Sequence, residues 1–143
     1  MSVAEIFKTL EYGPAPESAD TASAWLDGHN RQFELFVDNA WHAPAGDAYL
    51  DVRNPATGDL LARVADAGEA DVDRAVAAAR QAYVTWSETS GHVRARYLYA
   101  LARNIQKHAR LFAVIESLDN GKPIRESRDL DIPLVARHFY HHA

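Results

Sequence analysis

The feature that most constrains the fold is an unbroken order of strand, turn, strand and helices over residues 51–123. A short β-forming run meets the turn Asn-Pro-Ala-Thr-Gly at 54–58, where proline and glycine favour a reversal of the chain. A second apolar run at 60–65 and amphipathic helices follow, and Asn-Gly-Lys-Pro at 120–123 ends the last of these helices. The stretch contains no nucleophile elbow, metal cluster or phosphate loop. The sequence therefore predicts a scaffold over these residues and not a site.

Three amphipathic helices are predicted after Gly68. Apolar residues recur there at spacings of three and four, which places them on one face of each helix. They are Val72, Val76, Ala79, Tyr83 and Trp86 in the first helix, Leu98, Leu101, Ala102 and Ile105 in the second, and Leu111, Phe112, Ile115 and Leu118 in the third. Acidic residues in the first turn of the first helix complement its dipole. A fourth helix is predicted over residues 127–143, with Pro133 as a kink or as the start of a new first turn.

Short strands are predicted before these helices. Residues 33–37 and 40–42 should form a hairpin across an Asp-Asn pair, because both residues tolerate positive φ. Residues 49–53 alternate in polarity as a strand does, and residues 60–65 are their expected partner across the Pro/Gly turn. The pattern therefore predicts a small antiparallel β region in a chain that is otherwise mostly helical.

An N-terminal arm with short helices is predicted over residues 1–32. Ile6, Phe7 and Leu10 fit one face of a short helix, which two prolines then end. Residues 20–26 fit a second helix, ended by a glycine. Docking of this arm on another surface and a disordered leader are equally compatible with its sequence.

Composition excludes several classes of function. A net charge of −5 argues against a nucleic-acid partner, and no apolar run approaches the roughly 20 residues that span a bilayer. The first residues lack the apolar core of a secretory signal, so we expect a cytoplasmic protein. The chain has no cysteine, which excludes disulfides, thiolate metal sites and thiol catalysis by its own residues.

Two local patterns resemble sites but have simpler interpretations. His138, His141 and His142 share a helix face, as metal ligands would. No carboxylate lies next to them in the last turn, so a solvated cationic patch is the favoured interpretation. The Gly-Lys pair at 121–122 could form a phosphate-binding turn, but a single glycine favours a helix stop.

Five motifs, in this order, resemble the N-terminal segment of the aldehyde dehydrogenase superfamily. They are Phe-Val-Asp-Asn-Ala-Trp at 36–41, Asn-Pro-Ala-Thr-Gly-Asp at 54–59, Asp-Val-Asp-Arg-Ala-Val-Ala-Ala-Ala-Arg at 71–80 with Trp86, Arg-Ala-Arg at 94–96 with Leu98 and Leu101, and Glu-Ser-Leu-Asp-Asn-Gly-Lys-Pro at 116–123. The resemblance covers residues 33–143, and the extra N-terminal length is similar to that of longer members. It implies an α/β parent fold with a Rossmann-like NAD(P)-binding domain, of which residues 33–143 form an incomplete N-terminal part.

The resemblance also implies an activity that this chain cannot carry out alone. In the family a cysteine thiolate attacks the aldehyde, hydride passes to NAD or NADP, a glutamate activates water, and an asparagine helps to hold the oxyanion. The segments that bear these groups lie further along in the family and are absent here. We therefore expect no catalytic and no cofactor-binding residue in this chain, and no cofactor bound by it alone.

One lesser site of the family does match this sequence. Many members hold a monovalent cation near the first strand through main-chain oxygens, a donor type that suits a hard cation. The matching positions are Val52, Arg53 and Asp119, and at least one further ligand would come from sequence outside the chain.

Two functions of different class follow. The first is the N-terminal portion of an NAD(P)-dependent aldehyde dehydrogenase, whose partners are the remainder of that enzyme and, in the parent, further copies of it. The alternative is a non-catalytic binding or assembly module that docks on a partner chain. The last predicted helix has no stop signal, which favours truncation, whereas a stop codon after Ala143 in the native gene would favour the module.

Overall fold

The structure is a computed structural model that describes residues 18–143; the predicted helix around Ile6, Phe7 and Leu10 lies outside these residues. The helices are α2 (Asp20–Gly28), α3 (Glu69–Glu88), α4 (Gly91–Lys107), α5 (Ala109–Asn120), α6 (Ile124–Glu126) and α7 (Ile132–His142), with the π-helical turn η1 (Ser127–Asp131) between the last two. All four helices predicted after Gly68 are confirmed. Pro133 lies in the first turn of α7, directly after the π-helical turn.

The strands form two small sheets. Strands β4 (Tyr49–Arg53) and β5 (Leu60–Ala65) pair antiparallel, as predicted, with a bulge between Val52 and Arg53. Strands β2 (Leu35–Val37) and β3 (Ala40–His42) form the predicted hairpin, and both residues of its Asp-Asn turn have positive φ. The prediction of one strand over residues 33–37 was wrong, because Phe33 belongs to β1 (Gln32–Phe33), which pairs parallel with β5 in the other sheet.

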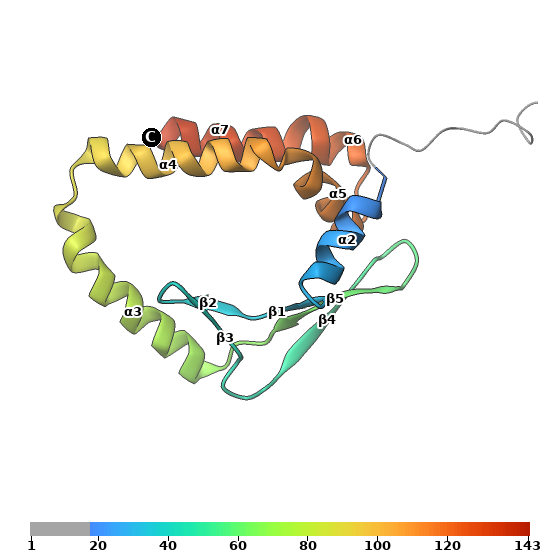
Figure 1. Cartoon of the computed structure of the whole chain (residues 1–143), viewed down its shortest axis with the longest axis horizontal. Coiled ribbons are helices and arrows are strands. Elements are labelled where there is room, and N and C mark those ends of the chain that lie inside the picture. The colour runs from blue at the N-terminus through green and yellow to red at the C-terminus, as the bar shows by residue number, and fades with distance from the viewer. Residues whose placement is uncertain (1–17) are drawn as a thin grey trace, which may run out of the picture.

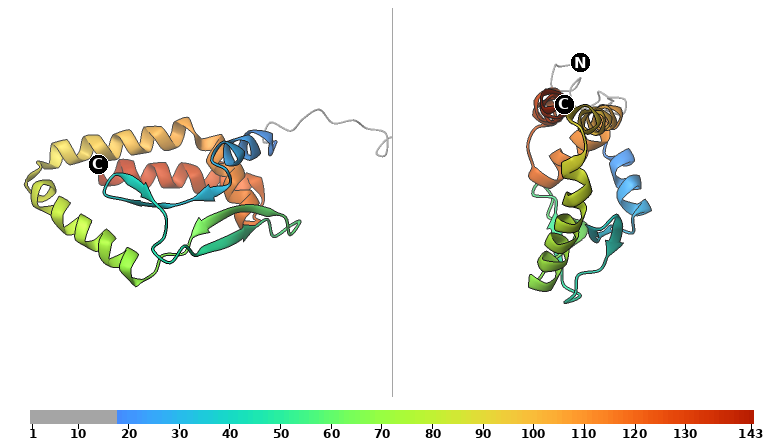
Figure 2. Two further views of the ribbon diagram at one scale, coloured as in Figure 1. Left: turned by 60° about the horizontal axis from the view of Figure 1, so that its bottom comes forward. Right: turned by 90° about the vertical axis from the view of Figure 1, so that its left-hand side faces the viewer.

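The elements surround an open centre. Helices α4 and α7 lie side by side along one side, α3 runs down a second, and the strands close the ring towards α2 and α5 (Figure 1; Figure 2). Ala102 of α4 and Ala136 of α7 are buried at the contact between these two helices, where small side chains allow a close approach. Tyr140 donates a hydrogen bond to the side-chain oxygen of Gln106 at 2.8 Å and fixes the pair near the end of α7.

A buried carboxylate joins the loop after β3 to the start of α3. Asp71 is 2% exposed, and its oxygens accept hydrogen bonds from the main-chain N–H groups of Ala45 (3.0 and 3.2 Å) and Gly68 (3.2 Å). Arg74 pairs with the same carboxylate at 3.0 Å. The sequence pattern placed Asp71 only as a helix-dipole charge, whereas the structure makes it the polar centre of this corner.

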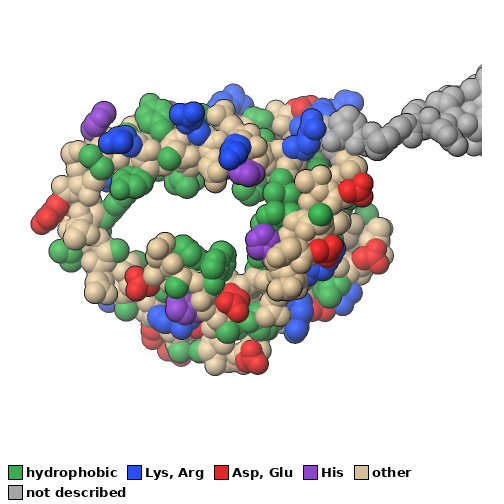
Figure 3. All heavy atoms as spheres, in the orientation of Figure 1, with side chains coloured by type: hydrophobic (Ala, Val, Ile, Leu, Met, Phe, Trp, Pro, Cys, Tyr) green, Lys and Arg blue, Asp and Glu red, His purple; other side chains and the backbone are tan. Residues whose placement is uncertain are grey.

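Large apolar side chains remain largely uncovered in the part of the chain that the structure describes. The buried apolar residues are mostly alanines. Val72, Val76, Tyr83 and Trp86 of the predicted α3 stripe are all exposed, and green side chains line the opening in the space-filling view (Figure 3). The apolar face of α3 was therefore predicted correctly, but little of the described structure packs against it. Among residues 18–143, no helix is long and apolar enough to cross a membrane.

We expect the isolated 143-residue chain to bind a hydrophobic dye and to self-associate, because its apolar helix faces stay in contact with water. Replacing Val76 and Tyr83 of α3 by serine should lower dye fluorescence, and replacing the exposed Arg80 of the same helix should not. Dye titration and sedimentation measure both effects. A monomer that melts cooperatively without binding dye would contradict this expectation.

Candidate functional site

Two turns that lie far apart in the sequence meet at the end of α5. Gly121 ends α5 with a left-handed conformation, φ 79°, which confirms the predicted helix stop. A Cβ atom placed on Gly121 would lie 2.7 Å from Cγ of Pro55, in the turn between β4 and β5. The 54–58 turn and the Gly-Lys-Pro turn are therefore one packed unit, and this unit sets the position of β4 relative to α5.

Lys122 joins this unit to the next helical segment. Its ammonium group lies 2.8 Å from the carboxylate of Asp131 and 3.1 Å from that of Glu116. Hydrogen bonds to Asp131 first, and then to Glu116, raise the pKa of Lys122 above its ordinary value. The two ion pairs of Lys122 hold the Gly-Lys-Pro turn against α5 and the π-helical turn. They give this lysine a structural role that needs no phosphate ligand.

The structure places the three predicted cation ligands around one region. Val52 and Arg53 end β4 at the bulge, and Asp119 lies in the last turn of α5. Val52 and Asp119 line the same pocket, of about 220 Å³, whereas Arg53 does not line it. The Arg53 side chain instead binds the Asp51 carboxylate at 2.9 Å and the carbonyl oxygen of Gly58 at 3.2 Å.

This pocket has one charged group on an apolar wall. Its other lining residues come from α2, α5 and the three-stranded sheet, and include Leu26, Ala62 and Ile115. Asp119 has no ion pair among residues 18–143. Strand β4 is an edge strand, so part of its main-chain oxygens lack a strand partner. A carboxylate without an ion pair and main-chain oxygens are both donor types that suit a hard cation.

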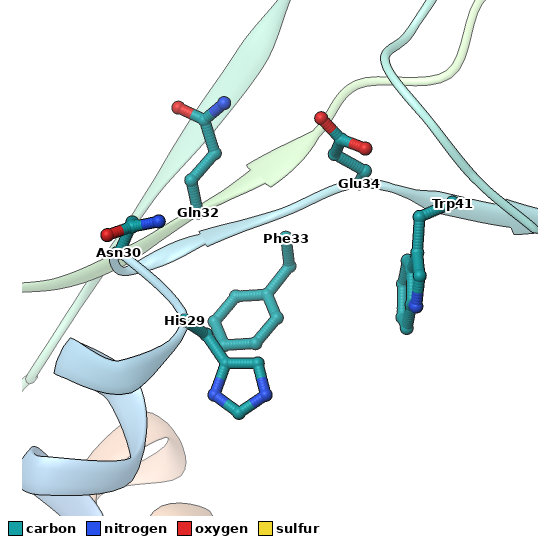
Figure 4. Close-up of a pocket in the computed structure, with 6 residues that line it drawn as sticks. All are labelled: His29, Asn30, Gln32, Phe33, Glu34 and Trp41. Atoms are coloured by element: carbon teal, nitrogen blue, oxygen red, sulfur yellow. The ribbon is translucent and has the colours of Figure 1, made fainter.

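A second pocket, of about 350 Å³, was not predicted from the sequence. Its lining residues His29 and Phe33 have ring centres 5.8 Å apart, and the other side of the His29 ring lies 4.2 Å from the ring of Trp25, which does not line this pocket. In Figure 4, Phe33, His29 and Trp41 project to one side of the strand, and Glu34 projects to the other. The pocket thus offers flat aromatic surfaces and the imidazole of His29, while the carboxylate of Glu34 points away from them. In the sequence, the spacing of four between Trp25, His29 and Phe33 was the pattern that could have indicated contact between these rings.

The histidines of the C-terminal helix lie apart from both pockets. The rings of His141 and His142 contact each other edge to face, with centres 5.0 Å apart. No group of three or more His, Asp or Glu side chains within residues 18–143 could hold a metal ion. Within the described residues, these histidines therefore have no set of partners with which to hold a metal ion.

The comparison with protein families finds a match that covers most of the chain. Residues 41–143 match the model of the aldehyde dehydrogenase family. Acetaldehyde dehydrogenase 2 of Cupriavidus necator is 41% identical over 115 residues. That alignment includes 80% of this chain but only 23% of the relative.

Solved structures give the same result. PnpE from Pseudomonas sp. WBC-3 superposes with a TM-score of 0.75 at 40% identity, over 77% of this chain and 23% of its own. PnpE has also been solved in complex with nicotinamide adenine dinucleotide. The NAD⁺ complex of an aldehyde dehydrogenase from Bacillus cereus superposes with a TM-score of 0.78 at 34% identity, over 92% of this chain and 26% of its own. The chain thus spans about a quarter of the length of these relatives.

Proposed function

The chain belongs to the aldehyde dehydrogenase family, and from this premise we propose that it forms the N-terminal part of an NAD-dependent enzyme that oxidises an aldehyde to a carboxylic acid. In this proposal residues 33–143 begin the cofactor-binding domain, and residues 1–32 are an arm that precedes it. The observation that carries the proposal is the family match over 41–143, together with relatives solved with bound NAD.

The contribution of these residues to the reaction is structural. The packed turns at Pro55 and Gly121 hold β4 and α5 in a fixed relation, and the exposed faces of α3 and α4 offer apolar surface to further sequence. Thiolate attack, hydride transfer and water activation need groups that this chain does not contain, the cysteine first among them. We propose that the remainder of the parent enzyme supplies them, in a cytoplasmic homo-oligomer.

We expect the 143-residue chain to be inactive on its own, because no thiol is present to attack the carbonyl. Incubation with NAD or NADP and a panel of aldehydes should give no cofactor reduction above background. A full-length relative treated in the same way serves as the positive control. Aldehyde-dependent reduction by the chain alone would overturn this part of the proposal.

We also propose that Val52, Arg53 and Asp119 contribute to a monovalent cation site, with main-chain oxygens from the strand and the free carboxylate from α5. Support comes from the shared pocket of Val52 and Asp119 and from the bulge at the end of β4. Arg53 can take part only through its main chain, because its guanidinium is a donor and already binds Asp51.

The cation site can be tested in a chimera in which residues 33–143 replace the matching segment of C. necator acetaldehyde dehydrogenase 2, which supplies the missing ligand. Crystals soaked in rubidium should show an anomalous peak beside Asp119. The peak should disappear in Asp119→Asn and persist in Glu116→Gln, which changes a carboxylate one turn away. An unchanged peak in Asp119→Asn, or no peak in the parent chimera, would contradict the proposal.

A further inference from the structure

One helix face carries positive charge that the described structure leaves unbalanced. Residues 89–115 contain five cationic side chains and no Asp or Glu. The whole chain has a net charge of −5, so the remaining residues carry −10. We call Arg96, Arg103, Lys107 and Arg110 the cationic face: spacings of seven and four place the first three on one side of α4, and Arg110 follows in the first turn of α5, after the break between the two helices at His108.

The cationic face is exposed and lies opposite the apolar side of α4. All four of its residues are exposed, and blue side chains stand over the pair of helices α4 and α7 in the space-filling view (Figure 3). None of the four has an ion pair within residues 18–143, although Arg31, Arg53, Arg63, Arg74 and Lys122 all do. Unbalanced positive charge along one line favours an acidic partner.

The N-terminal segment joins the described structure at one end of this face. Arg110 lines a small pocket of about 90 Å³ with Ser18, the first described residue. The other walls of the pocket are Thr21 and apolar or small residues of α2 and α5, so the pocket suits one apolar side chain. Whatever precedes Ser18 therefore leaves the structure beside the cationic face.

The segment that precedes Ser18 has matching chemistry. Residues 1–17 contain Glu5, Glu11 and Glu17 against a single Lys8, with Ile6, Phe7 and Leu10 as apolar residues. The part of the cationic face on α4, from Lys107 back to Arg96, is about 17 Å long at 1.5 Å per helical residue. Seventeen residues span up to roughly 55 Å when extended, so the segment can reach the whole face.

We propose that residues 1–17 dock on the cationic face of their own chain, with their carboxylates against Arg103, Lys107 and Arg110. The occupant is thus a segment of this protein, chosen by its attachment point, its charge and its reach. Docking would cover the side of α4 opposite its apolar stripe, and it is independent of any dehydrogenase activity.

The lysine content of the chain makes a direct test available. The only lysines are Lys8, Lys107 and Lys122, and a carbodiimide joins a lysine amine to a carboxylate only when the two are in contact. After treatment of the full chain, the monomer band is digested and mapped by mass spectrometry. We expect Lys107 to be linked to Glu11 or Glu17. The Lys122 pairs with Glu116 and Asp131, at 3.1 and 2.8 Å, serve as the internal positive control.

Charge reversal separates docking from chance contact. Arg103→Glu with Arg110→Glu leaves Lys107 in place and should lower the yield of its link to the segment by roughly fivefold, because two attractive contacts become repulsive. Arg80→Glu on α3 removes a cation that also lacks an ion pair among the described residues, and it should leave the yield unchanged.

Three results would overturn the proposal. The first is a Lys122 control link that forms while Lys107 is linked to no residue of 1–17. The second is a link whose yield survives the double reversal on the cationic face. The third is a link that is found only in the dimer band, between ¹⁵N-labelled and unlabelled chains of a mixture, because the contact would then join two molecules.

Discussion

Replacement of Gly121 by alanine is expected to destabilise the chain by about 2–5 kcal/mol, from two separate causes. The left-handed conformation at φ 79° costs an L-residue about 1–2 kcal/mol. The new Cβ would also lie 2.7 Å from Cγ of Pro55, and overpacking of this kind costs about 1–3 kcal/mol. The Cγ atom of Pro55 is part of a rigid ring in a tight turn. Neither this ring nor the backbone at residue 121 can therefore move away without disturbing the contact between β4 and α5.

Gly58 provides the matched control for Gly121. It has nearly the same conformation, φ 80°, but nothing lies within 4 Å of the position of its Cβ. Gly58→Ala should therefore cost only the conformational part. Adding Pro55→Ala to Gly121→Ala should recover the steric part, as a double-mutant cycle would measure. Urea unfolding followed by circular dichroism in dilute solution gives each value, and equal costs for both glycines would show that the Pro55 contact contributes nothing.

The second large effect is expected at Asp71, where replacement by alanine should cost about 2–4 kcal/mol. The variant leaves the N–H groups of Ala45 and Gly68 without their acceptor, and a hydrogen bond to a charged group contributes about 1.5–3 kcal/mol. It also removes a negative charge from the first turn of α3 and the partner of Arg74. We expect the helix start and the loop after β3 to lose order together.

Asp73 is the control for this experiment, since it lies on the same helix but is exposed. Asp73→Ala should change the free energy of unfolding by less than about 0.5 kcal/mol, as is usual for surface sites. Asp71→Asn keeps one acceptor oxygen, so its free energy of unfolding should lie between those of the two alanine variants. Hydrogen exchange at Ala45 and Gly68 reports the same contact locally. Unchanged protection there in Asp71→Ala would show that the carboxylate does not hold this corner.

The sequence was sufficient to predict those elements whose cause is local. Helices α3, α4 and α5 have regular apolar spacing, the β2–β3 hairpin has a turn pair suited to positive φ, and α5 has a glycine stop. Each of these signals lies within about one helical turn of the residues that it organises. The predicted boundaries therefore agree closely with the structure, although many apolar side chains of these helices stay exposed among residues 18–143.

Contacts between distant segments could not be predicted in the same way. The parallel pairing of Phe33 with Val64 of β5 depends on how the chain returns to the first strand. Likewise, Asp71 reaches Ala45 across 26 residues, and Gly121 meets Pro55 across 66. Periodicity shows which face of an element is apolar but does not identify its partner. The resemblance to a family supplied the candidate positions Val52, Arg53 and Asp119, which no local pattern indicates.

The rate of NAD reduction by the chimera that carries residues 33–143 of this chain tests the central proposal most directly. If these residues are the N-terminal part of a dehydrogenase cofactor domain, the chimera should reduce NAD in the presence of acetaldehyde, and the chain alone should not. The chimera's melting transition and oligomeric state are compared with those of the parent enzyme to establish that it is folded. A folded chimera with the parent's oligomeric state but no aldehyde-dependent reduction of NAD would contradict the proposed function.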